Sequence, residues 1–158
     1  NPWYMEMQEL GYNYRITDIQ CALGKSQLKK LNKFIEKRIE LVNRYDSAFN
    51  SYDLIDTIQP HHRDNSSHHL YVIKVDFNQV NINRAQLMHE LLNKGIATQV
   101  HYIPVTSHPY YSERGYKTHN YPKAQAYYEQ ALSIPLYYSL TFSEQDYVIE
   151  TLKNLIQK

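Results

Sequence analysis

The longest regular pattern in the sequence lies between residues 19 and 49, where apolar residues recur every three or four positions. The series is Ile19, Leu23, Leu28, Leu31, Ile35, Ile39, Val42, Tyr45 and Phe49. This spacing places them on one side of an α-helix. Thr17 and Gln20 have the spacing of a capping box at its start. We therefore expect one long helix over 17–50, joining two packing units or contacting a second subunit.

Shorter patterns follow this helix. Residues 70–77 alternate apolar and polar positions, and 96–103 form a second mainly apolar run, so both are expected to be strands. Between them Asn83 can cap a helix that runs to Asn93, with Gly95 as its C-terminal stop. The buried face of this helix is expected to hold Leu87, Met88, Leu91 and Leu92.

The last third of the sequence mixes irregular and helical patterns. Residues 104–122 are rich in Pro, Ser, His and Tyr without a clean period, which predicts an ordered, irregular loop. A helix over 122–132 and an extended segment over 133–137 follow. The final helix is expected to begin near Ser143, with Asp146 as its capping partner. The chain after residue 50 is thus expected to be a small α+β domain.

Charge and composition exclude several classes of protein. The 17 basic and 16 acidic residues leave a net charge of +1, too little to gather phosphate backbones, so no nucleic-acid partner is expected. No apolar run approaches the roughly 20 residues that cross a bilayer, so no membrane partner is expected either. The single cysteine, Cys21, cannot form an internal disulfide, which favours the cytoplasm. Its helical position predicts a buried side chain.

Two further features suggest a piece of a larger protein. The sequence opens on Asn1 without a methionine, and it has only 4 glycines beside 16 tyrosines. Because cofactor enzymes use glycines in phosphate loops and tight turns, we expect this chain to be a fragment. Its eight histidines lack the spacing of known zinc motifs, so no metal site is expected, and His61 and His62 are interpreted as solvated loop residues.

The strongest local signal is the segment Tyr12-Asn13-Tyr14-Arg15, directly before the long helix. Asn and Arg beside a helix N-terminus suit an anion such as phosphate or carboxylate. The alternative from the residues alone is that the tyrosines pack and Arg15 pairs with a surface carboxylate. The tyrosine pairs at 110 and 111, 127 and 128, and 137 and 138 likewise suit an interface, sugar stacking or plain packing.

At this point the sequence resembles a known family. The segment LGYNYRITDIQCALGKSQLKKL, residues 10–31, is similar to the hallmark block of the DegT/DnrJ/EryC1/StrS sugar aminotransferases. VHYIPV (100–105) and ALSIPLYYSLT (131–141) are similar to later blocks, in the same order. The resemblance covers nearly the whole chain. It looks closest to the branch that aminates UDP-4-keto-6-deoxy-N-acetyl sugars on the way to pseudaminic acid.

The resemblance implies a fold-type I aminotransferase of α/β class, with pyridoxal phosphate as cofactor, UDP-sugar as substrate and glutamate as amino donor. It implies a homodimer in which Asn13 reaches the cofactor phosphate of the partner subunit, with Arg15 also at that site. Tyr12, Tyr14, His101 and Tyr102 are expected to border the substrate. By the same comparison, residues 1–16 end a large domain, 17–50 link the domains, and 51–158 form the C-terminal small domain.

The resemblance also implies what this chain lacks. The Schiff-base lysine and the cofactor-ring contacts of the family belong to the large domain, and no lysine here has a matching motif. The chain alone is therefore expected to be inactive and to hold no catalytic residue. Two other functions remain open at this stage. One is a stand-alone, non-catalytic module for dimerisation or sugar-nucleotide binding, and the other is a small metal-binding protein built on the histidines.

Overall fold

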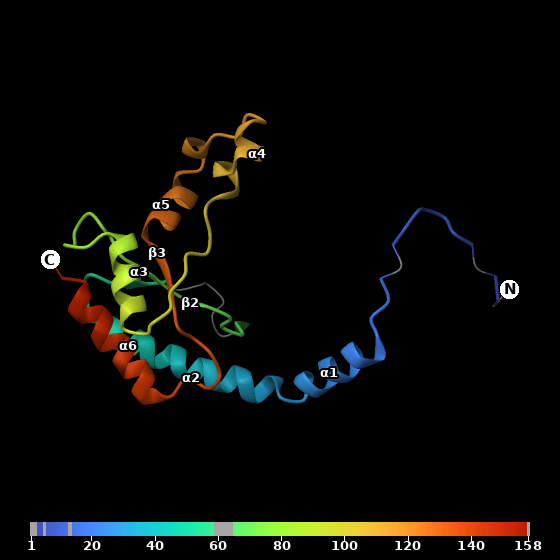
Figure 1. The fold of residues 1–158 in the computed structure, drawn as a ribbon, viewed down its shortest axis with the longest axis horizontal. Helices are drawn as coiled ribbons and strands as arrows, with labels where there is room; N and C mark the ends of the chain where they lie inside the picture. Colours follow the sequence, from blue (N-terminus) through green and yellow to red (C-terminus); the bar gives the residue numbers. More distant parts are fainter. Residues whose placement is uncertain (1–2, 5, 13, 59–64, 158) are drawn as a thin grey trace. The chain divides into compact units, whose positions relative to one another are not determined.

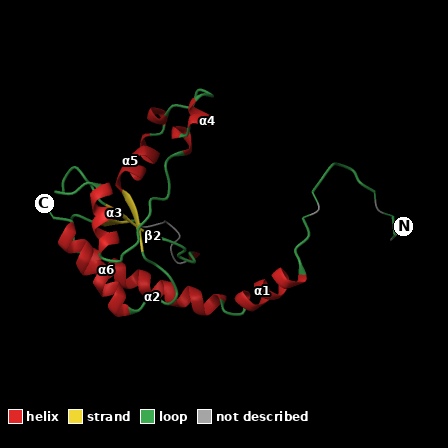
Figure 2. Ribbon diagram, in the orientation of Figure 1, coloured by secondary structure: helices red, strands yellow, loops and turns green. Residues whose placement is uncertain are grey.

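The computed structural model describes the whole chain except residues 1–2, 5, 13, 59–64 and 158. It divides the chain into two compact units, Asn1–Lys33 and Phe34–Lys158. Figure 1 shows the order of the helices and strands, and Figure 2 shows where helix, strand and loop lie along the chain. The two units are described separately below.

The first unit consists of an irregular segment followed by helix α1 (Asp18–Leu28). The predicted capping box is confirmed, because the Gln20 N–H donates to Thr17 Oγ1 at 3.3 Å and the Thr17 N–H donates to Gln20 Oε1 at 2.9 Å. No residue of α1 is buried. The prediction that Cys21 is buried is wrong, since its side chain is exposed. Among the described residues of this unit, none covers the helix.

The predicted continuous helix is two helices, α1 and α2 (Leu31–Phe49), divided by a turn at Lys29 and Lys30. At the turn the Lys29 N–H reaches the Lys25 carbonyl only at 3.4 Å, and the Lys30 N–H donates to Gln27, three residues back. Lysines at 25, 29 and 33 are four residues apart, and like charges at that spacing destabilise a helix. This repulsion gives a physical reason for the break.

The second unit is built on a three-stranded antiparallel sheet. Strand β2 (Tyr71–Lys74) lies between β1 (Asp56–Thr57) and β3 (Ala131–Ile134), with Tyr71 opposite Ile134 and Thr57 opposite Ile73. The helices of this unit are α2, α3 (Arg84–Asn93), α4 (Pro109–Ser112), α5 (Pro122–Gln130) and α6 (Phe142–Leu155). Single 3₁₀ turns lie at η2 (Val105–Ser107) and η3 (Thr118–Asn120). The predicted α/β class with a small antiparallel sheet is confirmed.

The hydrophobic core of the second unit lies between the sheet and helices α2, α3 and α6. Its most deeply buried members are Tyr45, Phe49, Ile73, Val75, Leu87, Leu91, Leu132, Leu152 and Ile156. Burial of this many large apolar side chains is the main source of stability for such a domain. The core draws on the C-terminal half of α2, whose buried residues begin at Leu41.

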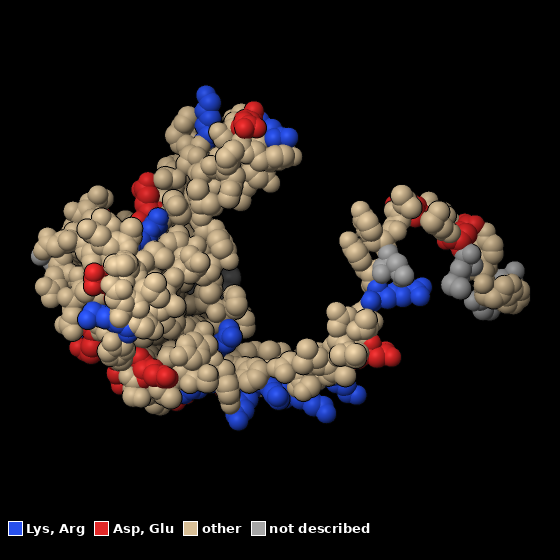
Figure 3. All heavy atoms as spheres, in the orientation of Figure 1, with Lys and Arg blue, Asp and Glu red and all other residues tan. Residues whose placement is uncertain are grey.

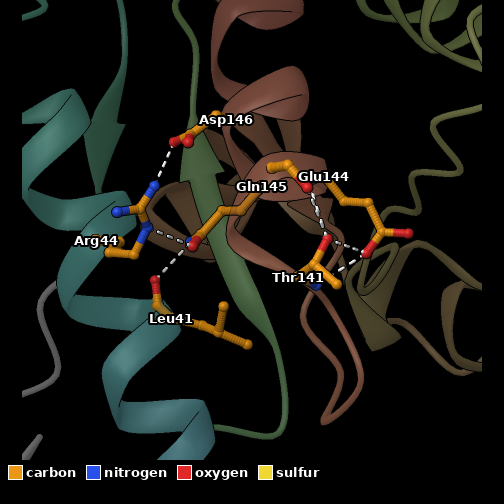
Figure 4. Close-up of polar contacts among 7 residues, drawn as sticks. Leu41, Arg44, Thr141, Glu144, Gln145 and Asp146 are labelled. Atoms are coloured by element: carbon orange, nitrogen blue, oxygen red, sulfur yellow. Dashed lines mark hydrogen bonds and ion pairs between the residues drawn. The ribbon is translucent and has the colours of Figure 1, made fainter.

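A polar network joins α2 to α6 beside this core (Figure 4). The Gln145 side chain is completely buried and donates from Nε2 to the Leu41 carbonyl at 2.7 Å. Its Oε1 accepts from Arg44 Nε at 3.1 Å, and Arg44 also forms an ion pair with Asp146. A buried amide is tolerated only when its donor and acceptor are both satisfied, and here both are.

Several predicted elements differ from the structure. The strand expected over 96–103 is reduced to a single bridge between Gln99 and Ser133. The next hydrogen-bonded pair of an antiparallel ladder would be His101 with Ala131, but the Ala131 N–H donates to the Tyr127 carbonyl at the end of α5 and is not available to extend the pairing. Leu92, expected on the buried face of α3, is exposed because it lies about 100° around the helix from Leu91.

The final helix begins earlier than expected. Its N-cap is Thr141, with Glu144 as the capping-box partner, rather than Ser143 with Asp146. Asp146 instead pairs with Arg44. Helix α5 ends at Gln130 and strand β3 begins at Ala131, two residues before the extended segment was expected. The helix over 84–93, its Asn83 cap and the Gly95 stop at φ 77° are confirmed.

Candidate functional site

Tyr12, Tyr14 and Arg15 form an exposed group just before α1. The two tyrosine rings stack at a centroid distance of 5.2 Å and an interplanar angle of 12°. The Tyr14 N–H donates to the Tyr12 carbonyl at 3.0 Å, which keeps these two residues together. The tyrosines are 84% and 87% exposed, so their contact with each other leaves most of both rings open. Asn13, expected to reach a cofactor phosphate, lies outside the described residues.

The surroundings of Arg15 suit an anionic group. Its side chain is exposed, and no carboxylate among the described residues pairs with it. It lies three positions before Asp18, the first residue of α1, where unpaired backbone amides carry partial positive charge. The Thr17–Gln20 capping box satisfies only part of these amides. A guanidinium and a helix N-terminus in one short segment can bind phosphate or carboxylate.

His101 and Tyr102 form a second group, in the Phe34–Lys158 unit. The His101 ring contacts the hydroxyl of Ser133 on β3, with Nδ1 and Oγ 2.7 Å apart. The Tyr102 ring packs edge-on against the imidazole at 4.6 Å. Ser133 is buried, whereas Tyr102 is 71% exposed. The site thus has an imidazole fixed from the sheet side and a phenol ring that faces solvent.

Tyr127, on α5, supports the same group. Its hydroxyl donates to the His101 carbonyl at 3.3 Å, and burial raises the pKa of the phenol. Tyr127 also lines a cavity of about 280 Å³. The other lining residues are Ile58, Ser66, His68, His69, Leu70, Tyr71 and Val72. Because the Tyr127 phenol stays protonated to a higher pH than usual, it remains a hydrogen-bond donor over the physiological range.

Ser133 was not identified from the sequence, and Tyr127 was considered only as one of a tyrosine pair that suits an interface, sugar stacking or plain packing. Both contact His101 only through the fold, because they lie on β3 and α5, far along the chain. One signal was available for Ser133. It is the one polar residue in a strand, Ala131–Ile134, that is buried throughout, and a buried hydroxyl needs a partner.

The predicted site residues fall into two groups, one in each unit. Tyr12 and Tyr14 are in contact within the first unit, and His101 and Tyr102 within the second. Within the described part of the chain, no three His, Cys, Asp or Glu residues are grouped so as to hold a metal ion. His61 and His62 lie outside the described residues. No described helix is long and apolar enough to cross a membrane.

Comparison with known proteins shows which class this fold belongs to. Residues 1–153 match the model of the DegT/DnrJ/EryC1/StrS aminotransferase family. Because the match covers nearly the whole chain, the chain belongs to this family.

Two relatives illustrate the similarity within the family. The spore coat polysaccharide biosynthesis protein SpsC of Bacillus subtilis (strain 168) is 37% identical over 157 residues, which cover 98% of this chain and 40% of SpsC. A UDP-4-amino-4,6-dideoxy-N-acetyl-beta-L-altrosamine transaminase of Campylobacter jejuni is 37% identical over 158 residues, covering 99% of this chain and 41% of that enzyme. The chain therefore spans about two fifths of the length of these curated relatives.

A solved structure supports the same assignment. Spr1654 from Streptococcus pneumoniae, designated a sugar aminotransferase, is 34% identical in its PMP-form, with a TM-score of 0.85. The alignment covers 98% of this chain and 39% of Spr1654. The same protein in its PLP-form gives a TM-score of 0.85. The fold described above is thus the fold of the corresponding part of a sugar aminotransferase.

Proposed function

We propose that this chain is part of a pyridoxal-phosphate-dependent enzyme that aminates a nucleotide sugar. It would move the amino group of glutamate to the 4-keto carbon of a UDP-4-keto-6-deoxy-N-acetyl-hexose, for pseudaminic acid or a related surface glycan. The observation that carries this proposal is the family match over residues 1–153. The 37% identity to the Campylobacter jejuni transaminase favours this substrate class.

The proposed enzyme is longer than this chain, which covers about 40% of its relatives. We assign residues 1–16 to the end of a large domain, 17–50 to the connection between domains, and 51–158 to the small domain. The Schiff-base lysine would lie in the large domain, so this chain alone would be inactive. The exposure of Ile19, Leu23 and Leu28 on α1 is consistent with a helix that is covered in the longer protein.

The residues before α1 fit the cofactor that the family implies. Pyridoxal phosphate supplies an electron sink that allows an amino group to pass between two carbon skeletons. Its phosphate needs hydrogen-bond donors and positive charge, which Arg15 and the N-terminus of α1 offer. We propose that Asn13 donates its side-chain amide to the phosphate held by the partner subunit, with Arg15 beside it.

The tyrosines and the imidazole suit the sugar nucleotide. Tyr12 and Tyr14 offer open ring faces, on which a sugar can stack. Tyr102 offers a third ring, and His101 is held in one orientation by Ser133. With Nδ1 occupied by Ser133, the Nε2 atom of His101 is the ring position left to exchange a proton or hydrogen bond with a hydroxyl group.

The proposal requires a homodimer in the cytoplasm, where nucleotide sugars are available. Within the described part of the chain, Tyr12 and Tyr14 contact each other, and neither they nor Arg15 form a hydrogen bond, ion pair or ring contact with any other residue. An exposed cluster of two tyrosines and an arginine is typical of interface hot spots. Presentation to a second copy gives this cluster a partner that the single chain does not supply.

A non-catalytic binding module is the second candidate. The observation in its favour is that Phe34–Lys158 has a hydrophobic core of its own. Such a module would bind a sugar nucleotide or dimerise without any amino transfer. The two candidates differ in one measurable respect, because only the aminotransferase consumes glutamate.

The test is an assay of the longer protein that contains this chain. It would be incubated with pyridoxal phosphate, glutamate and a UDP-4-keto-6-deoxy-N-acetyl-hexose, while 2-oxoglutarate and the amino sugar are quantified. The proposed function predicts equal amounts of both products. A protein that binds the UDP-sugar but forms no 2-oxoglutarate would support the binding module instead. Replacing glutamate with glutamine or aspartate would identify the donor.

A further inference from the structure

A segment of the second unit, residues 102–121, forms a lobe that projects beyond the sheet at α4 (Figure 1). We call it the aromatic lobe. The outgoing and returning parts of the lobe are joined by a hydrogen bond between the hydroxyls of Ser107 and Thr118, which lie 3.0 Å apart. Short helical turns at η2, α4 and η3 order the segment between and beside these residues. A loop of this length that keeps a defined structure is usually functional.

The rings of the aromatic lobe are organised rather than scattered. Tyr110 and Tyr111 pack edge to face at 5.2 Å, and Tyr111 and Tyr116 at 6.0 Å. Gly115 adopts a φ of 89°, which reverses the chain and lets the Tyr116 N–H donate to the Tyr111 carbonyl at 3.2 Å. A side chain at position 115 would strain this turn. The rings nevertheless remain between 39% and 59% exposed.

Arg114 completes this cluster. Its guanidinium carbon lies 3.4 Å from the centre of the Tyr110 ring, and its Nη1 donates to the Tyr110 carbonyl at 2.8 Å. These contacts hold the guanidinium over the face of the ring. The arginine forms no ion pair with a carboxylate of the described residues, and it is exposed. A planar cation on an aromatic ring presents both a stacking surface and free N–H donors.

The charge of the aromatic lobe is positive. Arg114 and Lys117 face a single acidic residue, Glu113, within residues 102–121. Basic and acidic side chains are both visible at the tip of the lobe in Figure 3. Neither Arg114 nor Lys117 forms an ion pair with a carboxylate of the described residues, so both cations can meet an anionic ligand.

We propose that the aromatic lobe binds the nucleotide end of the substrate, a nucleoside diphosphate. The base stacks on the layer formed by Tyr110 and Arg114, while the diphosphate accepts hydrogen bonds from Arg114 and Lys117. Stacking on an aromatic ring and charge-assisted hydrogen bonds to phosphate are the two contacts that such a ligand requires. The inference rests on the proposed function, and it separates nucleotide recognition by the lobe from sugar contacts at His101 and Tyr102.

A protein segment is the competing occupant of an exposed aromatic surface. The residues favour the nucleotide, because the lobe combines exposed rings with two cations, Arg114 and Lys117, that pair with no carboxylate of the described residues. A diphosphate can pair with both cations, whereas an apolar peptide would leave them desolvated. Binding of a protein partner is therefore treated as an outcome that would contradict the proposal.

The test uses the longer protein and titrates it with uridine diphosphate in a calorimeter. Arg114→Ala and Tyr110→Ala are each expected to weaken binding by about tenfold, the effect of losing one charge-assisted or stacking contact. Arg114→Lys is expected to recover only part of this loss, because it keeps the charge but not the planar stack. Raising the salt concentration should weaken binding by the wild type more than by Arg114→Ala.

Lys94→Ala is the matched control, since it removes an exposed cation at the end of α3, outside the lobe. It should bind uridine diphosphate as the wild type does. The circular dichroism spectra of all four variants should match that of the wild type, which shows that a loss of affinity is not a loss of fold. Wild-type affinity for uridine diphosphate in Arg114→Ala would overturn the inference. A changed oligomeric state with unchanged affinity would overturn it as well, because the lobe would then be a protein contact.

The same experiment separates this inference from the proposed function. If the protein consumes no glutamate but Arg114→Ala weakens uridine diphosphate binding, the nucleotide-binding lobe is supported and the aminotransferase function is contradicted. If Arg114→Ala and Tyr110→Ala both aminate the sugar with normal kinetics, the aminotransferase function is supported and the nucleotide-binding lobe is contradicted.

Discussion

Apolar residues at helical spacing are buried in one unit of this chain and exposed in the other. In Phe34–Lys158, side chains from the sheet, α2, α3 and α6 meet in a core with several members completely buried. In Asn1–Lys33, the helix α1 carries an apolar series of the same spacing, and none of its residues is buried. The same sequence pattern therefore has two meanings. It marks a core where the chain supplies the partner surface, and an exposed apolar face on α1, where the described residues of its unit supply none.

The comparison is sharpest for large-to-small substitutions. We expect Leu152→Ala, at a completely buried position, to lower the free energy of unfolding of this chain by about 3 kcal/mol. Leu23→Ala, at an exposed position of α1, should change it by less than about 0.5 kcal/mol. Urea denaturation of the two variants measures both values. Equal losses would show that α1 is packed in solution, contrary to this account.

The buried amide of Gln145 provides a second test. Gln145→Ala removes the hydrogen bonds to Leu41 and Arg44 (Figure 4), and it leaves the Leu41 carbonyl with one partner fewer. We expect a loss of about 2 kcal/mol in the free energy of unfolding. Arg44→Ala should cost less, about 1 kcal/mol, because it removes only one of the two Gln145 hydrogen bonds together with a largely exposed ion pair. The reverse order, measured by the same denaturation, would locate the stabilisation in the contacts of Arg44.

Removing a helix cap is expected to give a smaller difference in stability between the two units. Thr141→Ala removes the cap of α6, which packs on the core, and should cost about 1 kcal/mol of the free energy of unfolding. Thr17→Ala removes the equivalent cap of α1, and the main unfolding transition should not move. Circular dichroism would detect the second change only as a small loss of helical signal. A shift of the main transition by Thr17→Ala would contradict the separation.

The smallest expected effect is a pH dependence of the α6 cap. The Thr141 N–H and hydroxyl donate to the Glu144 carboxylate at 2.8 and 2.7 Å, and these bonds lower the Glu144 pKa below its ordinary 4.5. A lowered pKa stabilises the folded state above pH 4.5, and the stabilisation is lost as the pH falls through the folded value. The stability difference between wild type and Glu144→Gln should therefore be constant near neutrality and shrink in acid. A stability difference that grows in acid would contradict a lowered Glu144 pKa.

Local features of the fold could be predicted from the sequence, and long-range ones could not. The capping boxes at Thr17 and Asn83 involve residues three positions apart, so the sequence contains both partners. The extent of a strand depends on a distant partner, and the run 96–103 pairs with β3 only at Gln99. The choice between Thr141 and Ser143 as a cap was ambiguous because both precede an acidic residue by three positions.

The candidate site divides in the same way. Tyr12, Arg15, His101 and Tyr102 came from a family resemblance to short blocks of sequence, and the family is confirmed. Their roles remain proposals. The contacts of His101 with Ser133 and Tyr127 depend on how β3 and α5 pack, which no local pattern encodes. The side chains that orient a site residue were thus the part that sequence analysis missed.

The central claim is that the segment before α1 completes the active site of a second subunit. It is tested most directly by mixing two inactive variants of the longer protein. One lacks the Schiff-base lysine, and the other carries Asn13→Ala with Arg15→Ala. Each variant alone should be inactive, whereas hybrid dimers contain one site with both the lysine and the intact segment.

After subunit exchange of an equal mixture, random pairing should restore about a quarter of the wild-type activity per subunit. Native mass spectrometry would confirm that hybrid dimers form. The account predicts that activity appears in proportion to the hybrid fraction. Hybrid dimers without activity would contradict it, because they would show that the lysine and the segment before α1 must belong to the same chain.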